Sequence, residues 1–512
     1  MTPIPRSHDD LALARLLARR GARPAAAAAL GALAALGLAP LGWWWITLPA
    51  LALALRLPAA QSRRAAFLHG WALGFGWFGL SLSWIVEPFF VDIARDGWMA
   101  PFALVLLPGG MALYWGAALA LGWRRRIWAL VAAWCLAEML RSWLFSGFPW
   151  SLPGHIWIDT PLAQLSALGG PFLLTALTLG LAAVIARVGP RPWLALPALA
   201  MAGGWIVLDP GPAPAPRPEA PLVRLVQPNQ AQALKSDPAM AQIFFDGLLA
   251  LSAGAPGDPR PDLIVWPEVA IPWPLDVAGG LLEETAQAVG GVPVALGLQR
   301  REGARWYNSL AVLDARGRPA DIYDKSHLVP FGEFVPFGDI MARFGIYGLA
   351  ASEGGGYSAG QGLRPVAVPG IGTALPLICY EGIFAGEVSA GAARGAVRPR
   401  MLMLVTNDAW FGTLSGPYQH FAQARLRAIE MGLPMVRVGN TGISAMIDGR
   451  GRVLARLDLG HEGALDAALP PALGVTPFAR FGSWPMALLL CAAFIAALPV
   501  RRAAIDPAAL RA

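Results

Sequence analysis

Long apolar runs alternate with short polar segments over the first 208 residues, and one more run lies near the carboxyl end. A helix needs about 20 predominantly apolar residues to cross a bilayer, and each run approaches that length. We therefore predict about seven membrane-spanning helices in residues 1–208, an eighth in residues 480–500, and a tail over residues 501–512. The runs cover residues 24–40, 41–57, 66–86, 99–122, 127–147, 161–186, 190–208 and 482–499.

The segment between the seventh and eighth runs has a different pattern. It opens with alternating prolines in residues 209–221, which favour an extended, semi-rigid linker. Residues 222–475 then alternate short apolar runs with helical patterns, which is typical of an α/β domain with layered sheets and helices. The expected strands are 222–226, 263–266, 294–298, 310–313, 375–379, 402–406, 435–438 and 444–447, and the expected helices are 238–252, 281–289 and 419–431.

One stretch of this domain, residues 337–357, is rich in glycine and apolar residues and fits neither pattern. Connections of this length inside a compact domain are usually functional or mobile. Its apolar residues, with Ile271 and Trp273 from another loop, are candidates to dip towards lipid or to keep water from the site. Simple packing on the domain is the alternative.

Composition and charge favour a membrane protein. Of 512 residues, 56% are hydrophobic and 14% are charged, whereas soluble domains carry about 25% charged residues. The net charge of +7 does not indicate nucleic-acid binding, because arginines gather in every second segment between the apolar runs. By the positive-inside rule, both termini lie in the cytoplasm and residues 209–480 lie outside. A cleaved signal peptide at the first run is the alternative.

The three cysteines differ in their surroundings. Cys135 and Cys491 lie in apolar runs, whereas Cys379 ends the strand expected at residues 375–379. A lone thiol at a strand end is a candidate nucleophile, and a buried cysteine that packs as a small hydrophobe is the alternative. A single cysteine in the α/β segment excludes a disulfide within it.

Two further residues fit thiol chemistry. Glu268 follows the strand expected at residues 263–266, and Lys325 is one of only two lysines among 40 Lys and Arg residues. A retained lysine offers a compact ammonium group with a pKa that can shift. A thiol needs a base and a nearby cation to become a nucleophile, and sites in α/β sheets collect at strand ends. Helix capping by Glu268 and an ordinary exposed position for Lys325 are the alternatives.

Other chemistries find little support in the sequence. The six histidines are scattered without metal-ligand spacing, so we expect no metal site. His327 fits a packing or hydrogen-bonding role. Glu138 and Arg141 lie three residues apart in the fifth apolar run. Charges inside a membrane are functional candidates, but this pair most simply neutralises itself near the outer interface.

The soluble segment resembles the nitrilase, or carbon–nitrogen hydrolase, superfamily. The resemblance rests on Trp266-Pro267-Glu268, Lys325, Cys379-Tyr380-Glu381 and residues 406–412. It implies an α-β-β-α sandwich with a Glu–Lys–Cys triad. In this triad Glu268 is the general base, Lys325 stabilises the oxyanion and the transition state, and Cys379 is the nucleophile.

Within that superfamily, the whole chain resembles the apolipoprotein N-acyltransferases of bacterial envelopes. The apolar runs on both sides of the domain, residues 327–336 and residues 226–229 carry this resemblance. It implies that Glu333, Tyr380 and Glu381 support the site or bind substrate. The chain departs from many relatives at Lys235-Ser236, where they have a lysine followed by a tryptophan, so a tryptophan contact to substrate is not expected there.

The resemblance also implies an activity and a location. The family moves an acyl chain from a phospholipid to the α-amine of the S-diacylglyceryl cysteine of an apolipoprotein, through a cysteine thioester and without a cofactor. The expected location is the bacterial inner membrane, with the catalytic domain on the periplasmic side and the protein as a monomer. Two alternatives remain at this stage: a membrane-tethered amidase or nitrilase that hydrolyses amides or esters, and a transporter with an inert outer domain.

Overall fold

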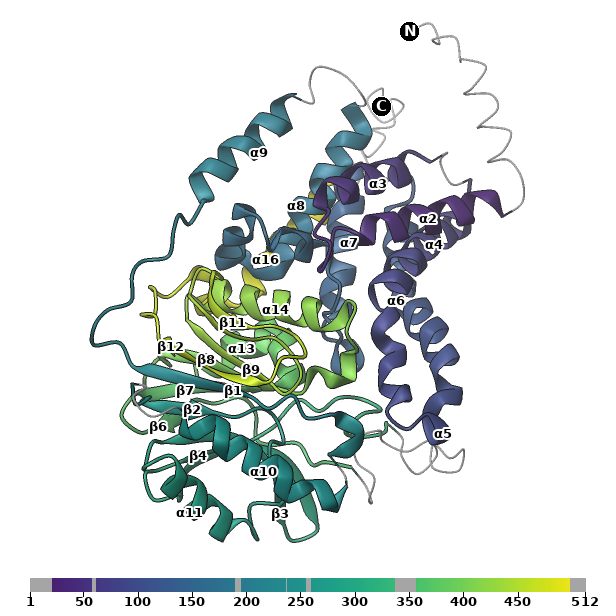
Figure 1. Ribbon diagram of the computed structural model, residues 1–512. Coiled ribbons are helices and arrows are strands. Elements are labelled where there is room, and N and C mark those ends of the chain that lie inside the picture. Colours follow the sequence, from purple (N-terminus) through teal and green to yellow (C-terminus); the bar gives the residue numbers. More distant parts are fainter. Residues whose placement is uncertain are drawn as a thin grey trace, which may run out of the picture.

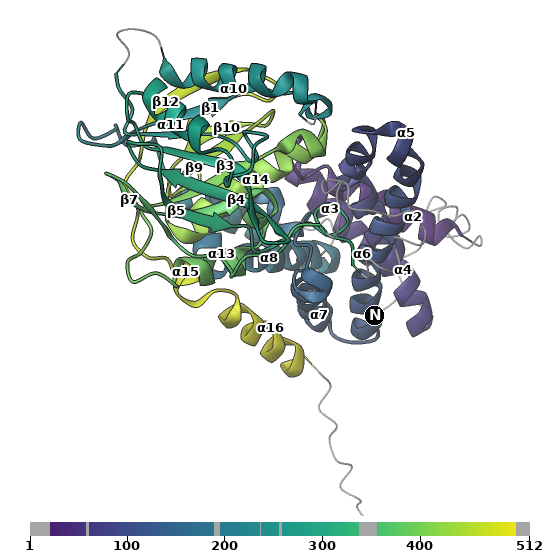
Figure 2. The ribbon, with the colours of Figure 1, turned by 90° about the horizontal axis from the view of Figure 1, so that it is seen from below.

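The computed structural model consists of a helical bundle and an α/β sandwich that pack against each other (Figure 1). The structure describes residues 21–57, 61–188, 195–235, 237–254, 259–336 and 356–497, without the side chains of residues 195–201. The predicted tail at residues 501–512 and most of the irregular stretch at residues 337–357 lie outside the described residues. Figure 2 gives a second view, in which the bundle again flanks the sandwich.

A helix lies in each of the eight apolar runs. These helices are α2 (Ala22–Ala35), α3 (Trp44–Arg56), α4 (Arg63–Ser81), α6 (Ala100–Gly122), α7 (Ile127–Arg141), α8 (Ser166–Val188), α9 (Ala195–Leu208) and α16 (Trp484–Ala496). The 209–221 linker contains neither helix nor strand and runs from α9 to the first strand (Figure 1).

Only some of these helices are long enough to cross a membrane unaided. In the described part of the chain, the helical stretches Ile93–Gly122 and Pro161–Val188 meet the requirements of length and apolarity. A third stretch qualifies if α4 and the 3-10 helix η1 (Ser83–Phe90), which are bent by 46°, form one span. Helices α2, α3, α9 and α16 have 13 or 14 residues, fewer than the roughly 20 residues of a full span. The chain is a multi-pass helical membrane protein, and the number of spans stays a prediction.

The α/β part contains two six-stranded sheets. The first has the order β12-β1-β2-β3-β4-β5 and the second the order β11-β10-β9-β8-β7-β6. The first sheet comprises β1 (Leu222–Gln227), β2 (Leu263–Val265), β3 (Val294–Glu302), β4 (Arg305–Leu313), β5 (Pro319–Asp324) and β12 (Gly463–Ala468). The second comprises β6 (Val366–Val368), β7 (Gly372–Ile378), β8 (Met401–Thr406), β9 (Met435–Gly439), β10 (Ser444–Ile447) and β11 (Val453–Leu457).

Helices cover the outer faces of both sheets. Helices α10 (Pro238–Ala253) and α11 (Gly279–Ala288) lie on the first sheet, and α13 (Ala385–Ala392) and α14 (Gly416–Met431) lie on the second (Figures 1 and 2). The α-β-β-α sandwich that the resemblance implied is therefore confirmed. All eight expected strands and all three expected helices are present.

The layers follow from the two-residue period of the strands. On β2, Leu263 and Val265 join the large core that contains the second sheet, whereas Ile264 packs with Phe245 of α10 and Leu282 of α11. Successive side chains of a strand point to opposite faces, so one apolar run supplies both layers.

Three inner strands of each sheet are parallel, and their carboxyl ends meet at one edge. Strands β1, β2 and β3 run parallel in the first sheet, as do β7, β8 and β9 in the second. Glu268 follows β2, Cys379 follows β7 and Asn407 follows β8. The topology therefore brings three segments that are far apart in sequence to one place.

The bundle holds the sandwich through polar and aromatic contacts. Trp150, between α7 and α8, donates from Nε1 to Oε1 of Gln419 on α14 at 2.6 Å. Arg425 of α14 pairs with Asp159 at 2.5 Å. The Trp84 ring of η1 lies 5.0 Å from the Phe411 ring, edge to face. These contacts fix the orientation of α14, and with it the segments that α14 touches.

Candidate active site

Glu268 is held by donors from both sheets. Its Oε1 accepts from Asn308 Nδ2 at 2.8 Å, and its Oε2 accepts from the Asn407 backbone N–H at 2.9 Å. Asn308 lies on β4 of the first sheet, and Asn407 follows β8 of the second. The side chain is only 8% exposed. The carboxylate is thus fixed in the seam between the sheets, and it does not cap a helix.

Lys325 lies between two carboxylates. Its Nζ is 2.9 Å from Glu333 Oε2, 3.0 Å from Glu333 Oε1 and 3.5 Å from Glu268 Oε1. Its backbone N–H donates to the Asn308 carbonyl at 2.8 Å. With 1% exposure, it is not an ordinary surface lysine. Burial alone would lower the pKa of Lys325, but Glu333, Glu268 and Cys379 outweigh it and raise that pKa, so the ammonium stays charged.

Cys379 has an unusual backbone conformation. It opens the short 3-10 helix η9 (Cys379–Ile383) directly after β7, with φ at +50°. A non-glycine residue in this region is uncommon, and such strained residues cluster at functional sites. Its thiol is buried, and it interacts electrostatically with both Glu268 and Lys325.

The electrostatics of the cluster favour a protonated thiol at rest. Burial raises the pKa of Cys379, as does Glu268, while Lys325 and Thr406 oppose the shift only in part. Two carboxylates and one ammonium leave a net charge of about −1 next to the sulfur. A thiolate therefore does not accumulate, and the proton leaves most easily by transfer to a nearby base.

Three predicted supporting residues take different positions. Glu333 joins the cluster, where its Oε2 also accepts from the Val329 N–H at 2.9 Å. Tyr380 turns towards the bundle and donates from its hydroxyl to the Gly147 carbonyl at 3.1 Å. Its ring lies 6.4 Å from that of Phe148.

Glu381 is a structural link behind the nucleophile. It is fully buried, and its Oε1 accepts from the Tyr323 hydroxyl at 2.5 Å and from the Ser326 N–H at 2.8 Å. Its Oε2 accepts from the Ile378 N–H at 2.9 Å. Burial raises the pKa of this carboxyl. Glu381 therefore ties the loop of Lys325 to the strand end of Cys379, and its oxygens face the protein.

Sequence reasoning missed several residues of this site. Asn308 bridges Glu268 and Glu333 through one amide nitrogen, at 2.8 and 3.0 Å. Tyr357 accepts at its hydroxyl from Gln299 at 2.5 Å, and burial raises its pKa to about 12 near the same cluster. The available signal was weak: Asn308 is a polar residue within the apolar run of β4.

Lys235 and the loop residues also have defined places. Lys235 donates from Nζ to the Val269 carbonyl at 2.7 Å, and burial lowers its pKa to about 8; Ser236 lies outside the described residues. Ile271 is buried in the core under α10, so it packs on the domain, which was the alternative, and does not face lipid. The Trp273 ring packs edge to face on Phe245 at 6.1 Å.

The two charged residues predicted in the fifth apolar run pair with each other. Glu138 and Arg141 form a fully buried ion pair. Glu138 also accepts from Trp115, and Arg141 donates to the carbonyls of Phe148 and Trp150. The carboxylate and the guanidinium are thus paired with each other inside the bundle, which supports the interpretation that the pair neutralises itself.

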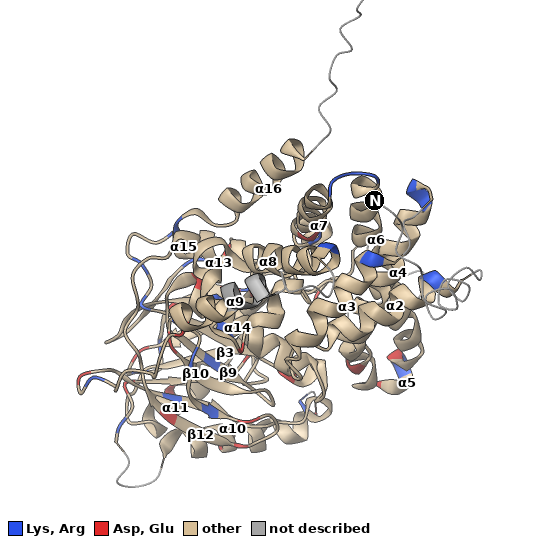
Figure 3. Ribbon diagram, turned by 90° about the horizontal axis from the view of Figure 1, so that it is seen from above, with Lys and Arg blue, Asp and Glu red and all other residues tan. Residues whose placement is uncertain are grey.

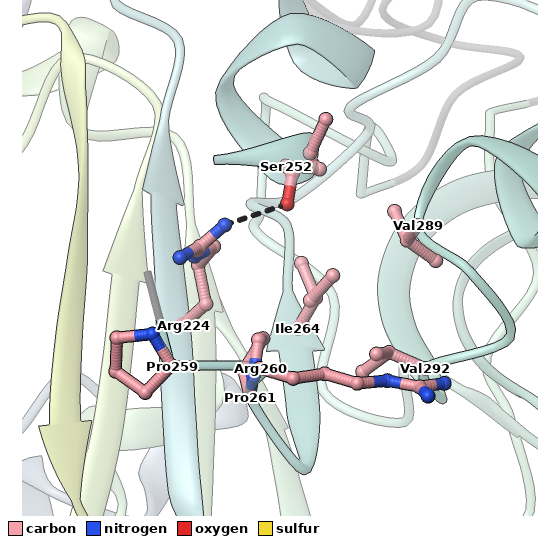
Figure 4. Close-up of a pocket in the computed structure, with 9 residues that line it drawn as sticks. Arg224, Ser252, Pro259, Arg260, Pro261, Ile264, Val289 and Val292 are labelled. Carbon is pink, nitrogen blue, oxygen red and sulfur yellow. Dashed lines mark hydrogen bonds between the residues drawn. The ribbon is translucent and has the colours of Figure 1, made fainter. Parts of the chain in front are cut away.

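A cavity of about 130 Å³ lies at the other end of the first sheet (Figure 4). Arg224 of β1 points across it to the Ser252 carbonyl at 2.9 Å and pairs with Asp466 at 2.6 Å. Val289 and Val292, just before β3, form another wall. Because β1, β2 and β3 are parallel, this cavity borders the end opposite to Glu268, so it is separate from the cluster.

Two family models match the chain. The model of the apolipoprotein N-acyltransferase N-terminal domain matches residues 30–184, and that of carbon-nitrogen hydrolase matches residues 222–476. Proteins named apolipoprotein N-acyltransferase are similar over most of the length. The protein of Sinorhizobium fredii is 40% identical, covering 78% of this chain and 79% of its own, and that of Bradyrhizobium diazoefficiens is 38% identical, covering 96% and 97%. The chain belongs to the apolipoprotein N-acyltransferase family.

As a member of this family the chain is an acyltransferase, and a transporter with an inert outer domain is excluded. Among solved structures, a variant of the amidase from Nesterenkonia sp. AN1 with an acetamide moiety on its active-site cysteine aligns with a TM-score of 0.39. That pair shares 17% identity and covers 54% of this chain and 98% of the amidase. A carbon–nitrogen hydrolase superfamily protein from Xanthomonas campestris aligns with a TM-score of 0.35, 21% identity, and coverage of 49% and 91%.

Proposed function

We propose that this protein transfers an acyl chain from a phospholipid to the α-amine of the S-diacylglyceryl cysteine of apolipoproteins, through a thioester on Cys379. The observation that carries the proposal is the buried cluster of Glu268, Lys325 and Cys379 at the meeting point of the two sheets, in a chain of this family. Glu333 joins the cluster as a second carboxylate, while Tyr380 and Glu381 hold its surroundings.

The first step forms the thioester. Glu268 takes the proton of the thiol as the sulfur attacks the ester carbonyl carbon of the phospholipid, and a C–S bond forms. The ester C–O bond then breaks, and Glu268 returns the proton to the leaving lysophospholipid alkoxide. General-base catalysis of this kind fits a thiol whose pKa is raised by burial.

The second step transfers the acyl group to the amine. The α-amine attacks the thioester carbon, a C–N bond forms and the C–S bond breaks. Glu268 accepts the amine proton and gives a proton back to the departing thiolate. In both steps Lys325 is the charged donor for the negative oxygen of the tetrahedral intermediate. Because the donor product leaves before the acceptor reacts, we expect ping-pong kinetics.

The proposal includes an orientation in the inner membrane, with the sandwich on the periplasmic side and both termini in the cytoplasm. Helices α4 and α6 run antiparallel through η1, so Arg63 at the start of α4 lies at the same end as Arg124, just after α6. Figure 3 marks these arginine-bearing segments. The η1 end contacts the sandwich through Trp84. The arginines thus gather away from the sandwich, as the positive-inside rule requires.

The proposed domain boundaries are 1–208, 209–221, 222–475, 480–500 and 501–512, and the protein is proposed to act as a monomer. Reporter fusions at the two termini and within residues 209–221 test the orientation. A terminus on the periplasmic side would overturn it.

Mass spectrometry of the purified protein tests the chemistry directly. After incubation with phospholipid alone, we expect one acyl group on the peptide that contains Cys379, released by hydroxylamine. After addition of a diacylglyceryl lipopeptide, we expect N-acylated peptide, and Cys379→Ala should abolish both products while the protein remains folded and inserted. Free fatty acid as the main product would instead indicate the hydrolase alternative.

A further inference from the structure

His420 of α14 lies directly behind the nucleophile. Its side chain is 1% exposed. Its Nε2 lies 3.3 Å from the carbonyl oxygen of Cys379, and its Nδ1 lies 2.9 Å from Asp408 Oδ1. Because a carbonyl oxygen only accepts hydrogen bonds, Nε2 must carry the hydrogen in this contact.

Asp408 holds the other side of the His420 ring. It is fully buried, and its Oδ2 accepts from Arg437 Nη2 at 2.7 Å. Burial alone would raise the pKa of Asp408, but Arg437 and His420 outweigh it and hold that pKa well below the ordinary value. Arg437 Nη2 also lies 3.2 Å from His420 Nδ1. The carboxylate is therefore charged and immobile.

A chain of contacts joins the backbone of Cys379 to Asp408. The carbonyl of Cys379 faces Nε2 of His420, and Nδ1 of the same ring faces Asp408 Oδ1. Thr406 also donates from its hydroxyl to Asp408 Oδ1, at 2.9 Å. The backbone of the nucleophile is thus connected to one buried carboxylate.

The backbone of Cys379 needs such a tie. A left-handed conformation is strained for a non-glycine residue, and Cys379 has φ at +50°. The peptide unit is planar and trans, so its carbonyl oxygen and the following N–H point in opposite directions. Holding the oxygen of Cys379 towards His420 fixes the direction of the Tyr380 N–H as well as the position of the thiol.

Aromatic residues prevent the His420 ring from turning. Trp150 of the bundle stacks on it, with ring centroids 5.8 Å apart and planes inclined by 25°. Phe411 meets it at 5.4 Å with an angle of 74°. A ring packed on both sides and bonded at both nitrogens has one orientation.

We propose that His420, oriented by Asp408, is a positioning residue that holds the strained peptide of Cys379 and thereby aims the thiol at Glu268 and Lys325. This inference rests on the proposed function, because it takes Cys379 as the residue that is acylated. His420 does not transfer protons in this scheme, since its Nε2 faces the carbonyl of Cys379 and not the thiol.

Two neutral amide variants test whether a donor at the position of Nε2, and not the imidazole ring itself, holds the Cys379 carbonyl. His420→Gln places an amide nitrogen near the position of Nε2, where it can still donate to the Cys379 carbonyl, whereas His420→Asn ends near the position of Nδ1. Both are made with Cys491→Ser, because Cys491 is an exposed thiol and Cys135 is buried. We expect His420→Asn to slow thioester formation about 10²-fold, and His420→Gln to stay within about 10-fold of the parent. The KM for phospholipid should change little in either variant.

Iodoacetamide alkylation of Cys379 provides a readout that does not depend on acyl transfer. We expect the same order of rates: parent, then His420→Gln, then His420→Asn. Equal rates for the two variants at equal thermal stability would overturn the inference. If the parent forms no thioester but the alkylation order holds, the proposed function fails and the positioning role stands.

A measurement on the unmodified ring covers the case in which His420→Asn does not fold. In the full chain with ¹⁵N-labelled histidine, we expect His420 to show a protonated Nε2 whose hydrogen exchanges slowly with water, assigned by its loss in His420→Gln. An unprotonated Nε2 would overturn the inference.

Discussion

The buried charges of the bundle and those of the sandwich are arranged in opposite ways. In the bundle, Glu138 faces Arg141, one negative charge against one positive charge, and carbonyls and an indole take up the remaining contacts. In the sandwich, Glu268 and Glu333 share the single ammonium of Lys325, and a thiol lies beside them. Both clusters are nearly inaccessible to water, so burial does not distinguish them.

The balance of charge distinguishes the two clusters. Loss of the charge on either partner of the Glu138–Arg141 pair would leave the other charged and alone in a low-dielectric interior. The second cluster instead contains a carboxylate, Glu268, that can accept the proton of the adjacent Cys379 thiol. The comparison predicts that changes to the first cluster affect stability, whereas changes to the second affect activity.

The largest expected effect is that of Glu268→Gln on acyl transfer. The amide keeps the shape of the side chain but cannot accept the thiol proton, so thioester formation should fall by about 10³–10⁴-fold. Stability should change little, because the cluster moves from net negative to neutral. Single-turnover acylation and thermal unfolding of the same preparation measure both quantities.

Glu333→Gln is the matched control for this prediction. It removes the same charge from the same cluster but leaves Glu268 in place, so thioester formation should fall much less than in Glu268→Gln. Equal losses in the two variants would show that net charge, and not the base, governs the rate.

The corresponding change in the bundle is Glu138→Gln. It leaves the Arg141 guanidinium buried without a counter-charge, which should cost about 3–5 kcal/mol of stability. Acylation per folded molecule should stay close to that of the parent. The double variant Glu138→Leu/Arg141→Met should recover most of the loss, since apolar replacements of buried pairs are often neutral. A double variant as unstable as the single one would contradict the charge argument.

A third buried pair sharpens the comparison, because it is balanced yet sensitive to pH. Glu430 pairs with Arg427 at 2.6 Å, and burial raises its pKa to about 7. The folded protein therefore binds an extra proton at Glu430 between pH 4.5 and 7, so the contribution of Glu430 to stability is fully present below pH 4.5 and is lost as pH rises through 7. The loss should be on the order of 1–3 kcal/mol.

Thermal unfolding at pH 5 and pH 8 checks this prediction. Glu430→Gln should remove most of the difference between the two pH values, whereas Glu302→Gln, at a carboxylate whose side chain is 65% exposed, should leave it unchanged. A pH dependence that survives in Glu430→Gln would assign it to another group.

The strands that could be predicted from the sequence are the inner ones. β5, β6, β11 and β12 were not predicted, and they are the four edge strands of the two sheets. An inner strand is buried on both faces and appears as an apolar run, whereas an edge strand such as β11 alternates half-buried and exposed residues. Helix α13 was missed too, because its eight residues, with two glycines, form no clear helical pattern.

The residues of the candidate site likewise divide into those that could be predicted from the sequence and those that could not. Glu268, Lys325 and Cys379 stand out because each is a chemically distinctive residue at a strand end. Their partners do not, because the contacts join distant segments: the Asn407 N–H that holds Glu268 is 139 residues away along the chain. His420 also looks unremarkable within α14 until the fold brings it under Cys379. Residue types identify the reacting groups, but only the packing of the sheets identifies the groups that hold them.

The smallest expected effect, Asn308→Asp, makes the excess charge of the site larger without changing its shape. The Asn308 amide donates to both Glu268 and Glu333, so an aspartate there would put a third carboxylate against the other two. Like charges at this distance favour uptake of a proton, and the acidic limb of the pH–rate profile for thioester formation should move up by about one pH unit. At high pH the rate should partly recover.

Asn308→Ser is the neutral control, since it removes the hydrogen bonds of the amide but adds no charge. Asn308→Ser should lower the rate at every pH without shifting the acidic limb of the pH–rate profile. If Asn308→Asp lowers the rate uniformly as well, the amide acts by geometry alone, and the excess negative charge is not what makes this cluster reactive.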